Sequence, residues 1–273
     1  MTEFEAIRRS SAPVTAKDTA IALANLDVRE GDLLVVHASI SALGWVAGGP
    51  QAVLDGLFTA VGSTGTITMP AHSGGLSEPS NWQNPPVPES WWETIRAEMS
   101  PFDVNLTPLR EMGALAETFH RMPGTLRSNH PTVSHLAHGP IARAITDDHR
   151  LEFGLGDASP LGRLYDAHAK IVLIGVDHDN NTSLHLAENR ADWPGRALRR
   201  QGSPVVIDGQ RVWATYEEVD PDTDDFIDVG RAHAEVHGER VTHLGAGIVR
   251  CIDMRSLVDF ATNWFAAHRG RPR

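Results

Sequence analysis

The sequence predicts an α/β fold, with a mixed, largely parallel central sheet, helices on both faces and one antiparallel hairpin. Residues 33–36 (LLVV) and 66–69 (TITM) are short apolar runs, typical of strands buried on both faces, and positions 50–61 between them are apolar at helical spacing. Such a strand–helix–strand unit implies parallel pairing. Asp208-Gly209, between β-rich arms over residues 205–217, is a strong hairpin signal.

The remaining elements follow along the chain. Thr15 can cap a helix over residues 15–26, with Asp18 at the capping-box position. We expect a helix over 109–122, a buried strand over 170–175, a helix starting near Asn181 or Thr182, and a last strand near 247–251 between two helices. Residues 71–108 are rich in proline and tryptophan and predict a long loop on the substrate side. Because no repeat or linker is visible, residues 1–273 are expected to form a single domain.

The chain is acidic, with 35 Asp and Glu residues against 24 Lys and Arg and a net charge of −11. This balance argues against nucleic acid as a partner, because such binding neutralises phosphates with basic residues. It fits a cationic ligand, or simply solubility. The single Cys251 excludes an internal disulfide. Neither a signal peptide nor a membrane-length apolar run is visible, so we expect a cytoplasmic protein with no membrane partner.

The segment 181–188 (NTSLHLAE) carries the first candidate for chemistry. It follows the strand at 170–175 and so lies at the carboxyl edge of the sheet, where α/β proteins bind ligands. His185 would lie in the first turn of a helix, whose dipole disfavours the charged imidazole and favours a neutral base. Glu188, three residues on, shares its helix face. The alternative is a histidine that simply hydrogen-bonds within the core.

An acidic run follows the predicted hairpin. Residues 217–228 contain no Lys or Arg and seven carboxylates: Glu217, Glu218, Asp220, Asp222, Asp224, Asp225 and Asp228. A solvated loop is the usual location of such a run. Because this one continues directly from a hairpin strand, its first members should be held in place. One of them could orient His185, and others could bind ammonium groups.

Two further segments could bind phosphate groups. The turn 39–49 (SISALGWVAGG) provides glycine amides just before a helix, as anion sites do, although its spacing matches neither GxGxxG nor the P-loop. Arg127 with Ser128 could supply a charge-assisted contact. The alternative for Arg127 is a surface salt bridge.

A metal site is a less favoured interpretation. The helix has no H-x-x-x-H pair, and the chain has no cysteine cluster. His72, His130 and His135 lie in other segments without ligand-like spacing. We therefore expect no metal, although five residues could be drawn as ligands: Asp177, His178, Asp179, His185 and Glu188.

Several segments between residues 32 and 218 resemble the aminoglycoside 3-N-acetyltransferase family: LVVHASISALGWVAGG, TITMP, RSNHPTVS, GLGDASPLGRLY and, above all, LIGVDHDNNTSLHLAE. The resemblance implies an acetyl-CoA-dependent, antibiotic-modifying enzyme with an antibiotic N-acetyltransferase-like fold, distinct from the GNAT fold. Ala38 departs from the family pattern, which often has a serine there, and this removes any role for a hydroxyl at that position.

The resemblance also implies roles for individual residues. His185 matches the family's catalytic histidine, and Glu218 and Asp220 fall where members keep acids that assist it and hold the aminoglycoside. Glu78 matches a substrate-contacting acid, and Glu188 is a further substrate-side candidate. The coenzyme-binding elements match ten residues: Ser39, Ile40, Leu43, Gly44, Trp45, Val46, Gly48, Arg127, Ser128 and His130.

The leading hypothesis is acetyl transfer from acetyl-CoA to the 3-amino group of a 2-deoxystreptamine aminoglycoside, by direct attack in a ternary complex. His185 is the predicted general base, oriented by Glu218, and backbone amides near Ser39 and Ile40 would stabilise the oxyanion. The alternatives are a same-fold acetyltransferase for a different amine metabolite, a metal-dependent hydrolase using His178 and His185, and a non-catalytic polycation-binding protein. The expected partners are a polycationic aminoglycoside and coenzyme A, bound to a monomer or homodimer.

Overall fold

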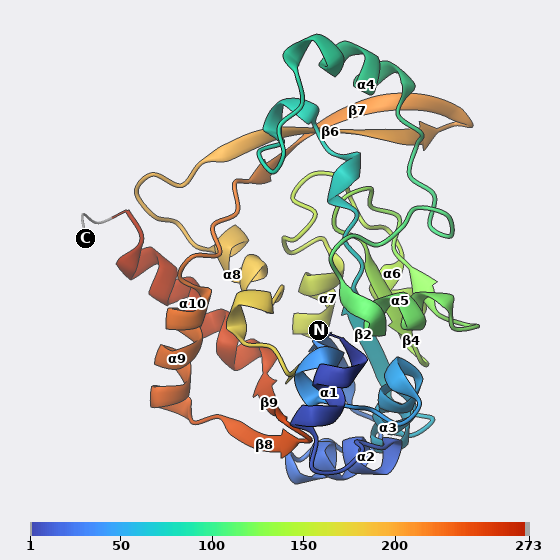
Figure 1. Ribbon diagram of the computed structural model, residues 1–273. Helices are drawn as coiled ribbons and strands as arrows, with labels where there is room; N and C mark the ends of the chain where they lie inside the picture. The colour runs from blue at the N-terminus through green and yellow to red at the C-terminus, as the bar shows by residue number, and fades with distance from the viewer. Residues whose placement is uncertain (1, 271–273) are drawn as a thin grey trace.

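The computed structural model describes residues 2–270 and is built around a seven-stranded sheet (Figure 1). The strands lie in the order β3-β4-β2-β1-β5-β9-β8. The central strand β1 (Leu33–Ala38) pairs in parallel with β2 (Thr66–Pro70) and with β5 (Lys170–Ile174). The outer strands pair antiparallel with their neighbours: β3 (Leu126–Arg127), β4 (His135–His138), β8 (Arg240–Leu244) and β9 (Gly247–Asp253).

The directions of the strands confirm the predicted mixed sheet. Within residues 2–270, β4 and β9 are reversed, and the other five of the seven strands run the same way. Among the seven strands of this sheet, parallel pairing is confined to the three central ones, whose apolar sequences predicted it.

Alternate residues of the central strands enter two separate hydrophobic cores. Leu34 and Val36 of β1 pack in one core, which α2 (Ala16–Asn25), α3 (Gly49–Val61) and α5 (Gly113–Arg121) cover. Leu33 and Val35 pack in the core on the opposite face. Because successive strand side chains point to opposite faces, an all-apolar strand needs cover on both. The second set of helices provides it: α6 (Ala142–Thr146), α7 (Pro160–Asp166), α8 (Leu184–Arg190), α9 (Phe226–His237) and α10 (Met254–His268).

Local signals in the N-terminal part are confirmed. Thr15 is the N-cap of α2, and it forms the predicted capping box with Asp18. Gly56 lets α3 approach α2 closely, because a Cβ there would lie 2.5 Å from the Cβ of Thr19. A shorter helix, α1 (Glu3–Arg9), precedes them.

A second, two-stranded sheet lies with α4 (Trp92–Glu98) at the end of the molecule opposite α2 and α3 (Figure 1). Strands β6 (Leu198–Ile207) and β7 (Gln210–Val219) form the predicted hairpin, longer at both ends than expected. Its turn is Asp208-Gly209, with φ values of 49° and 75°, as a type I′ turn requires. The segment 71–108, which contains α4, lies against the hairpin, and the N–H of Phe102 donates to the carbonyl of Pro204 at 3.0 Å.

Other elements differ from the sequence prediction. α5 begins at Gly113 and not at residue 109, because Glu111 has a φ of 61°, through which a right-handed helix cannot continue. Strands β3, β4 and β8 and helices α1, α4, α6 and α7 were not predicted, since they are short and carry neither apolar runs nor clear alternation. Helix α4 lies within residues 71–108, which were expected to form a loop. In the described part of the chain, no helix combines the length and apolar character needed to cross a membrane.

Candidate active site

His185 lies on α8, which follows the carboxyl end of β5 as predicted. Ser183, and not Thr182, is the N-cap residue, and its side chain makes no capping bond. The Nδ1 atom of His185 lies 2.5 Å from Oε2 of Glu188. Because a carboxylate can only accept a hydrogen bond, Nδ1 carries the proton, and Nε2 of the neutral ring is then an acceptor.

Glu188 is the carboxylate that orients His185. Its side chain is 1% exposed, although it lines the same pocket as His185, so the substrate contact expected from the sequence stays a prediction. Its Oε1 atom accepts a hydrogen bond from Arg269 Nη1 at 2.6 Å and another from the backbone N–H of Asp222 at 3.0 Å. The three-residue spacing on one helix face explains why Glu188, and not the predicted Glu218, reaches Nδ1.

His185 lines a pocket of about 160 Å³ between α8, the hairpin and the segment that follows β2. We call it the His185 pocket. Its polar lining includes His72, Asn189, Arg199 and Glu218, and Phe153, Leu155 and Pro221 supply apolar surface. The structure therefore brings His185 and Glu218 to one cavity, as expected, although the two side chains have different partners.

Glu218 reaches this pocket from β7 and is paired with Arg199. Its Oε1 accepts from Arg199 Nε at 2.6 Å and from Gln201 Nε2 at 3.1 Å. Arg199 stands directly opposite Glu218 in the hairpin register, and it also contacts Asp220, 3.3 Å from Nη1 to Oδ1. The acidic run thus has a cation that lies on the other strand, where its own sequence does not reveal it.

Glu78 lies beside the hairpin and lines neither the His185 pocket nor the second pocket described below. Its Oε1 is 2.5 Å from Arg96 Nη2, and its backbone N–H donates to Gln201 Oε1 at 2.7 Å. Gln201 therefore links Glu78 to Glu218. An acid already bound to an arginine is less suited to hold an ammonium group, so the structure does not support the expected direct substrate contact.

The remaining acids of residues 217–228 divide into two groups. Asp225 is buried and forms a two-pronged pair with Arg269, at 2.6 and 2.8 Å. The other group is exposed to solvent and is close in sequence to residues 218–221, which contribute to the lining of the His185 pocket: Glu217, Asp222, Asp224 and Asp228.

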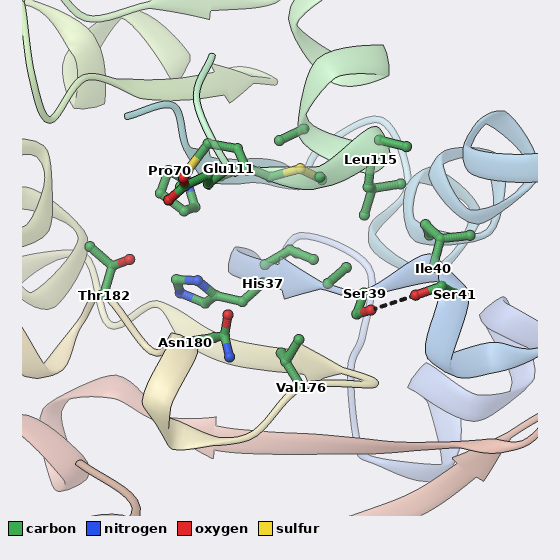
Figure 2. Close-up of a pocket in the computed structure, with 17 residues that line it drawn as sticks. His37, Ser39, Ile40, Ser41, Pro70, Glu111, Leu115, Val176, Asn180 and Thr182 are labelled. Atoms are coloured by element: carbon green, nitrogen blue, oxygen red, sulfur yellow. Dashed lines mark hydrogen bonds between the residues drawn. The ribbon is translucent and has the colours of Figure 1, made fainter. Parts of the chain in front are cut away.

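A second pocket of about 380 Å³ lies between the ends of β1 and β2, the start of α5 and the segment after β5. Figure 2 shows the ring of His37 inside it, close to Asn180 and Thr182, so we call it the His37 pocket. Ser39 and Ile40, two of the predicted coenzyme-binding residues, also line it. They belong to the turn that ends β1 and starts a 3₁₀ helix, η1 (Ile40–Leu43).

One turn connects the two pockets. It joins a 3₁₀ helix, η5 (His178–Asn180), to α8. Asn180 and Thr182 line the His37 pocket, whereas His185 lines the other, and the N–H of His185 donates to the carbonyl of Thr182 at 3.1 Å. Groups bound in the two pockets could therefore meet beside His185.

The second half of the turn 39–49 faces the N-terminal segment. The N–H of Trp45 donates to Ser10 Oγ at 2.7 Å, and Val46 forms a β-bridge with Val14. The N–H of Ser39 is also engaged, with the carbonyl of Ile174 at 2.9 Å, so this amide cannot stabilise an oxyanion. Five residues expected at the coenzyme accordingly lie outside the lining of both pockets: Leu43, Gly44, Trp45, Val46 and Gly48.

Arg127 holds together the segments that contain Ala71, Thr107 and Ser134, and each of its three guanidinium nitrogens bonds to the protein. Its Nε donates to Ser134 Oγ at 2.9 Å, Nη1 to the carbonyl of Thr107 at 2.6 Å, and Nη2 to the carbonyl of Ala71 at 3.0 Å. Burial lowers its pKa to about 10. The expected phosphate contact therefore does not fit the structure, because a buried, fully bonded guanidinium is part of the scaffold.

Ser128 and His130, the other predicted coenzyme residues of this segment, are also buried. Ser128 Oγ is 2.8 Å from His149 Nδ1, and it accepts from the N–H of His135 at 2.8 Å. His130 Nδ1 accepts from the N–H of Val133 at 3.1 Å. These contacts fold the connection between β3 and β4, and they leave no surface for a coenzyme.

Three histidines that the sequence did not single out as a group lie around the site. His37 lies near the carboxyl end of β1, and His72 lies two residues beyond the carboxyl end of β2. The His72 ring centroid is 6.2 Å from that of His135. Burial lowers the pKa of His37 to about 3, and repulsion from His135 and His185 adds to the effect. The carboxyl-edge rule that identified His185 could have identified His37 and His72 as well.

The structure separates His178 from the His185 pocket. His178 packs against Gly230, where a Cβ would lie 2.2 Å from its Cγ, and its Nε2 is 3.4 Å from Glu239. Across residues 2–270, no three His, Cys, Asp or Glu side chains are grouped so that they could hold a metal ion.

A partly buried histidine beside a buried glutamate, with two pockets near the carboxyl edge of a mixed α/β sheet, is an arrangement suited to an enzyme. The sequence match gives the family. The chain belongs to the aminoglycoside 3-N-acetyltransferase family, whose sequence profile matches residues 35–266. The family and the acyltransferase class expected from the sequence are thus confirmed.

Two curated relatives illustrate the match. The SPbeta prophage-derived aminoglycoside N(3')-acetyltransferase-like protein YokD of Bacillus subtilis is 40% identical over 260 residues, which cover 95% of each chain. Aminoglycoside N(3)-acetyltransferase VII of Streptomyces paromomycinus is 33% identical over 288 residues, which cover 100% of this chain and 99% of the relative.

Solved structures share the whole fold. YokD from Bacillus subtilis superposes with a TM-score of 0.94 at 38% identity, covering 98% of this chain and 99% of that one. AAC-IIIb, solved as a binary complex with CoASH, has a TM-score of 0.84 at 30% identity and covers 96% and 100%. AAC-VIa, solved with bound sisomicin, has a TM-score of 0.85 at 29% identity and covers 95% and 100%.

Proposed function

We propose that this chain transfers the acetyl group of acetyl-CoA to the 3-amino group of a 2-deoxystreptamine aminoglycoside, with His185 as the general base in a ternary complex. The observation that carries the proposal is the 2.5 Å contact between His185 Nδ1 and Glu188, which leaves Nε2 as the basic atom on a residue that lines the pocket. A positioned base of this kind contributes roughly 10²–10⁴-fold to the rate.

The His37 pocket is the proposed position of the thioester end of the coenzyme. Its lining includes the hydroxyls of Ser39 and Thr182 and the amide of Asn180, which can bond to carbonyl and amide groups. The AAC-IIIb structure with CoASH supports a coenzyme site on this fold. Bound there, acetyl-CoA supplies the acyl group and the thiolate leaving group.

The acceptor amine is proposed to occupy the His185 pocket. Attack by the neutral amine forms the N–C bond and breaks the C–S bond, while His185 takes the amine proton and can return it to the departing sulfur. Holding both reactants at one turn supplies much of the acceleration. The exposed Asp220 and Asp222 are proposed to attract the other ammonium groups of the substrate. The sisomicin-bound AAC-VIa structure supports an aminoglycoside acceptor.

One observation favours the second candidate, a same-fold acetyltransferase for a less cationic amine. Glu218 and Glu78 are both already paired with arginines, Arg199 and Arg96. A substrate with a single amino group would need fewer free carboxylates than an aminoglycoside does. A panel of amines, assayed by release of free thiol from acetyl-CoA, separates the two candidates by their kcat/KM values.

The test of the general base is His185→Asn, assayed with acetyl-CoA and sisomicin. We expect kcat to fall by about 10²–10⁴-fold, with coenzyme A affinity unchanged by calorimetry, and mass spectrometry of the wild-type product should show one acetyl on the 3-amino group. His168→Asn is the matched control, because His168 is exposed and lines neither pocket. Turnover by His185→Asn at the control's rate would refute the role of His185.

A further inference from the structure

Arg269, three residues beyond the segment that matches the family profile, lies in the network behind the proposed base. It is 7% exposed, although it follows the last helix, α10. Its Nη1 donates to Glu188 Oε1 at 2.6 Å, and its Nη2 and Nε bind the two carboxylate oxygens of Asp225 at 2.6 and 2.8 Å. All three guanidinium nitrogens therefore have protein acceptors.

Aromatic rings enclose the same guanidinium. Its central carbon lies 3.8 Å from the ring centroid of Phe265 and 4.9 Å from that of Trp193. Arginine is suited to such a position, because its planar group bonds at its edge and stacks on its faces. The guanidinium group of Arg269 thus has carboxylates at its edge and aromatic rings near it, and these contacts fix the position of the side chain.

The two carboxylate oxygens of Glu188 have different partners. Arg269 and the N–H of Asp222 both bond to Oε1, and His185 Nδ1 contacts Oε2 alone. Arg269 therefore prevents the Glu188 carboxylate from turning, so that Oε2 stays in place to accept the hydrogen bond from Nδ1 of His185.

We infer that Arg269 is a positioning residue for catalysis, acting through Glu188 to hold His185 with Nε2 directed at the acceptor amine and to limit the negative field on the imidazole. The inference rests on the proposed function of His185. A role confined to anchoring the end of α10 is the competing explanation, and it predicts loss of stability without a change in the pH profile.

Several charged or titratable groups surround the imidazole and share its field. Glu188 contacts it directly, and Arg269 and Asp225 lie behind Glu188. The others come from the sheet edge and the hairpin: His37, His72, Arg199 and Glu218. Removing the positive charge of Arg269 makes this field more negative and favours the imidazolium. The acid limb of the kcat–pH profile, which is the range where kcat falls as the pH is lowered, then moves to higher pH.

The experiment compares pH profiles of kcat for the wild type, Arg269→Gln, Arg269→Lys and Glu188→Gln. We expect the acid limb of Arg269→Gln to move upward by about one pH unit, and that of Glu188→Gln to move downward. The plateau of Arg269→Gln should fall by about tenfold, with KM for acetyl-CoA within about twofold. Because the acceptor amine is the same throughout, a difference between profiles belongs to the enzyme. Arg269→Lys retains the charge and should restore the wild-type limb.

Arg255→Met is the control, because Arg255 lies on α10, donates to the carbonyls of Tyr165 and Asp166, and is not among the residues that line the His185 pocket. It should lower the melting temperature and leave the acid limb in place. Should Arg269→Gln fail to fold, Asp225→Asn gives the test with the opposite sign, because losing a carboxylate moves the limb to lower pH.

An unmoved acid limb in Arg269→Gln, or in Asp225→Asn where that variant is used, overturns the inference while leaving the proposed function intact. Loss of the proposed function is recognised separately, by full activity of His185→Asn.

Discussion

His135 provides a sharp test of how burial sets the acid stability of this protein. It lies on β4, is 0% exposed, and within the described residues neither ring nitrogen has a hydrogen-bond partner. Burial lowers its pKa to about 4. Below pH 6.5 the unfolded chain therefore binds a proton at this position that the folded protein refuses, and the free energy of unfolding falls as the pH falls.

The size of the effect follows from the two pKa values. Between an unfolded pKa of about 6.5 and a folded pKa of about 4, the loss reaches about 3 kcal/mol by pH 4 and about 2 kcal/mol by pH 5. His135→Met removes the titrating group, keeps a similar volume and leaves no ring nitrogen to satisfy. At pH 7.5 we expect wild type and variant to agree within about 1.5 kcal/mol.

The assay is urea unfolding at a series of pH values, followed by tryptophan fluorescence. The variant should gain on the wild type by about 2 kcal/mol between pH 7.5 and pH 5. His168→Asn, which changes an exposed histidine, should show no such pH-dependent difference. Stability curves for His135→Met and wild type that stay parallel from pH 7.5 to pH 5 would refute the reasoning.

Two further predictions concern the coenzyme and the acceptor. Arg127→Met removes the clamp on Ala71 and Thr107 and should lower the free energy of unfolding by about 3 kcal/mol, with coenzyme A affinity of the folded protein, measured by calorimetry, changed less than threefold; a selective loss of coenzyme binding would restore the phosphate-contact hypothesis. Raising the salt concentration from about 0.02 to 0.3 M should raise KM for sisomicin more than it changes kcat, because exposed carboxylates attract the substrate through a screened field, and a salt-independent KM would contradict this.

Short sequence patterns predicted those elements whose conformation is fixed by residues close to one another in the sequence. The capping box of Thr15 and Asp18, the turn at Asp208-Gly209 and the apolar runs of β1, β2 and β5 each fix a conformation within a few residues. Strand β4 was not predicted, because its two histidines, His135 and His138, make it resemble a polar segment, and only the fold buries His135.

In the candidate site, too, some features follow from local sequence and others from contacts between distant residues. The sequence indicated His185 through its place after a buried strand, and Glu188 through its helical spacing. The cations that decide the behaviour of the acids come from distant parts of the chain: Arg199 pairs with Glu218 across the hairpin, and Arg269 reaches Glu188 over 81 positions.

By itself, then, the sequence determined the fold class and the family and identified His185 as the candidate base, because hydrophobic periodicity and short motifs carry that information. Only the tertiary structure decided which carboxylate holds His185, and that Arg127 stabilises loops where a phosphate contact was expected. A buried charge is defined by the partners that surround it, and those partners meet only when the chain has folded.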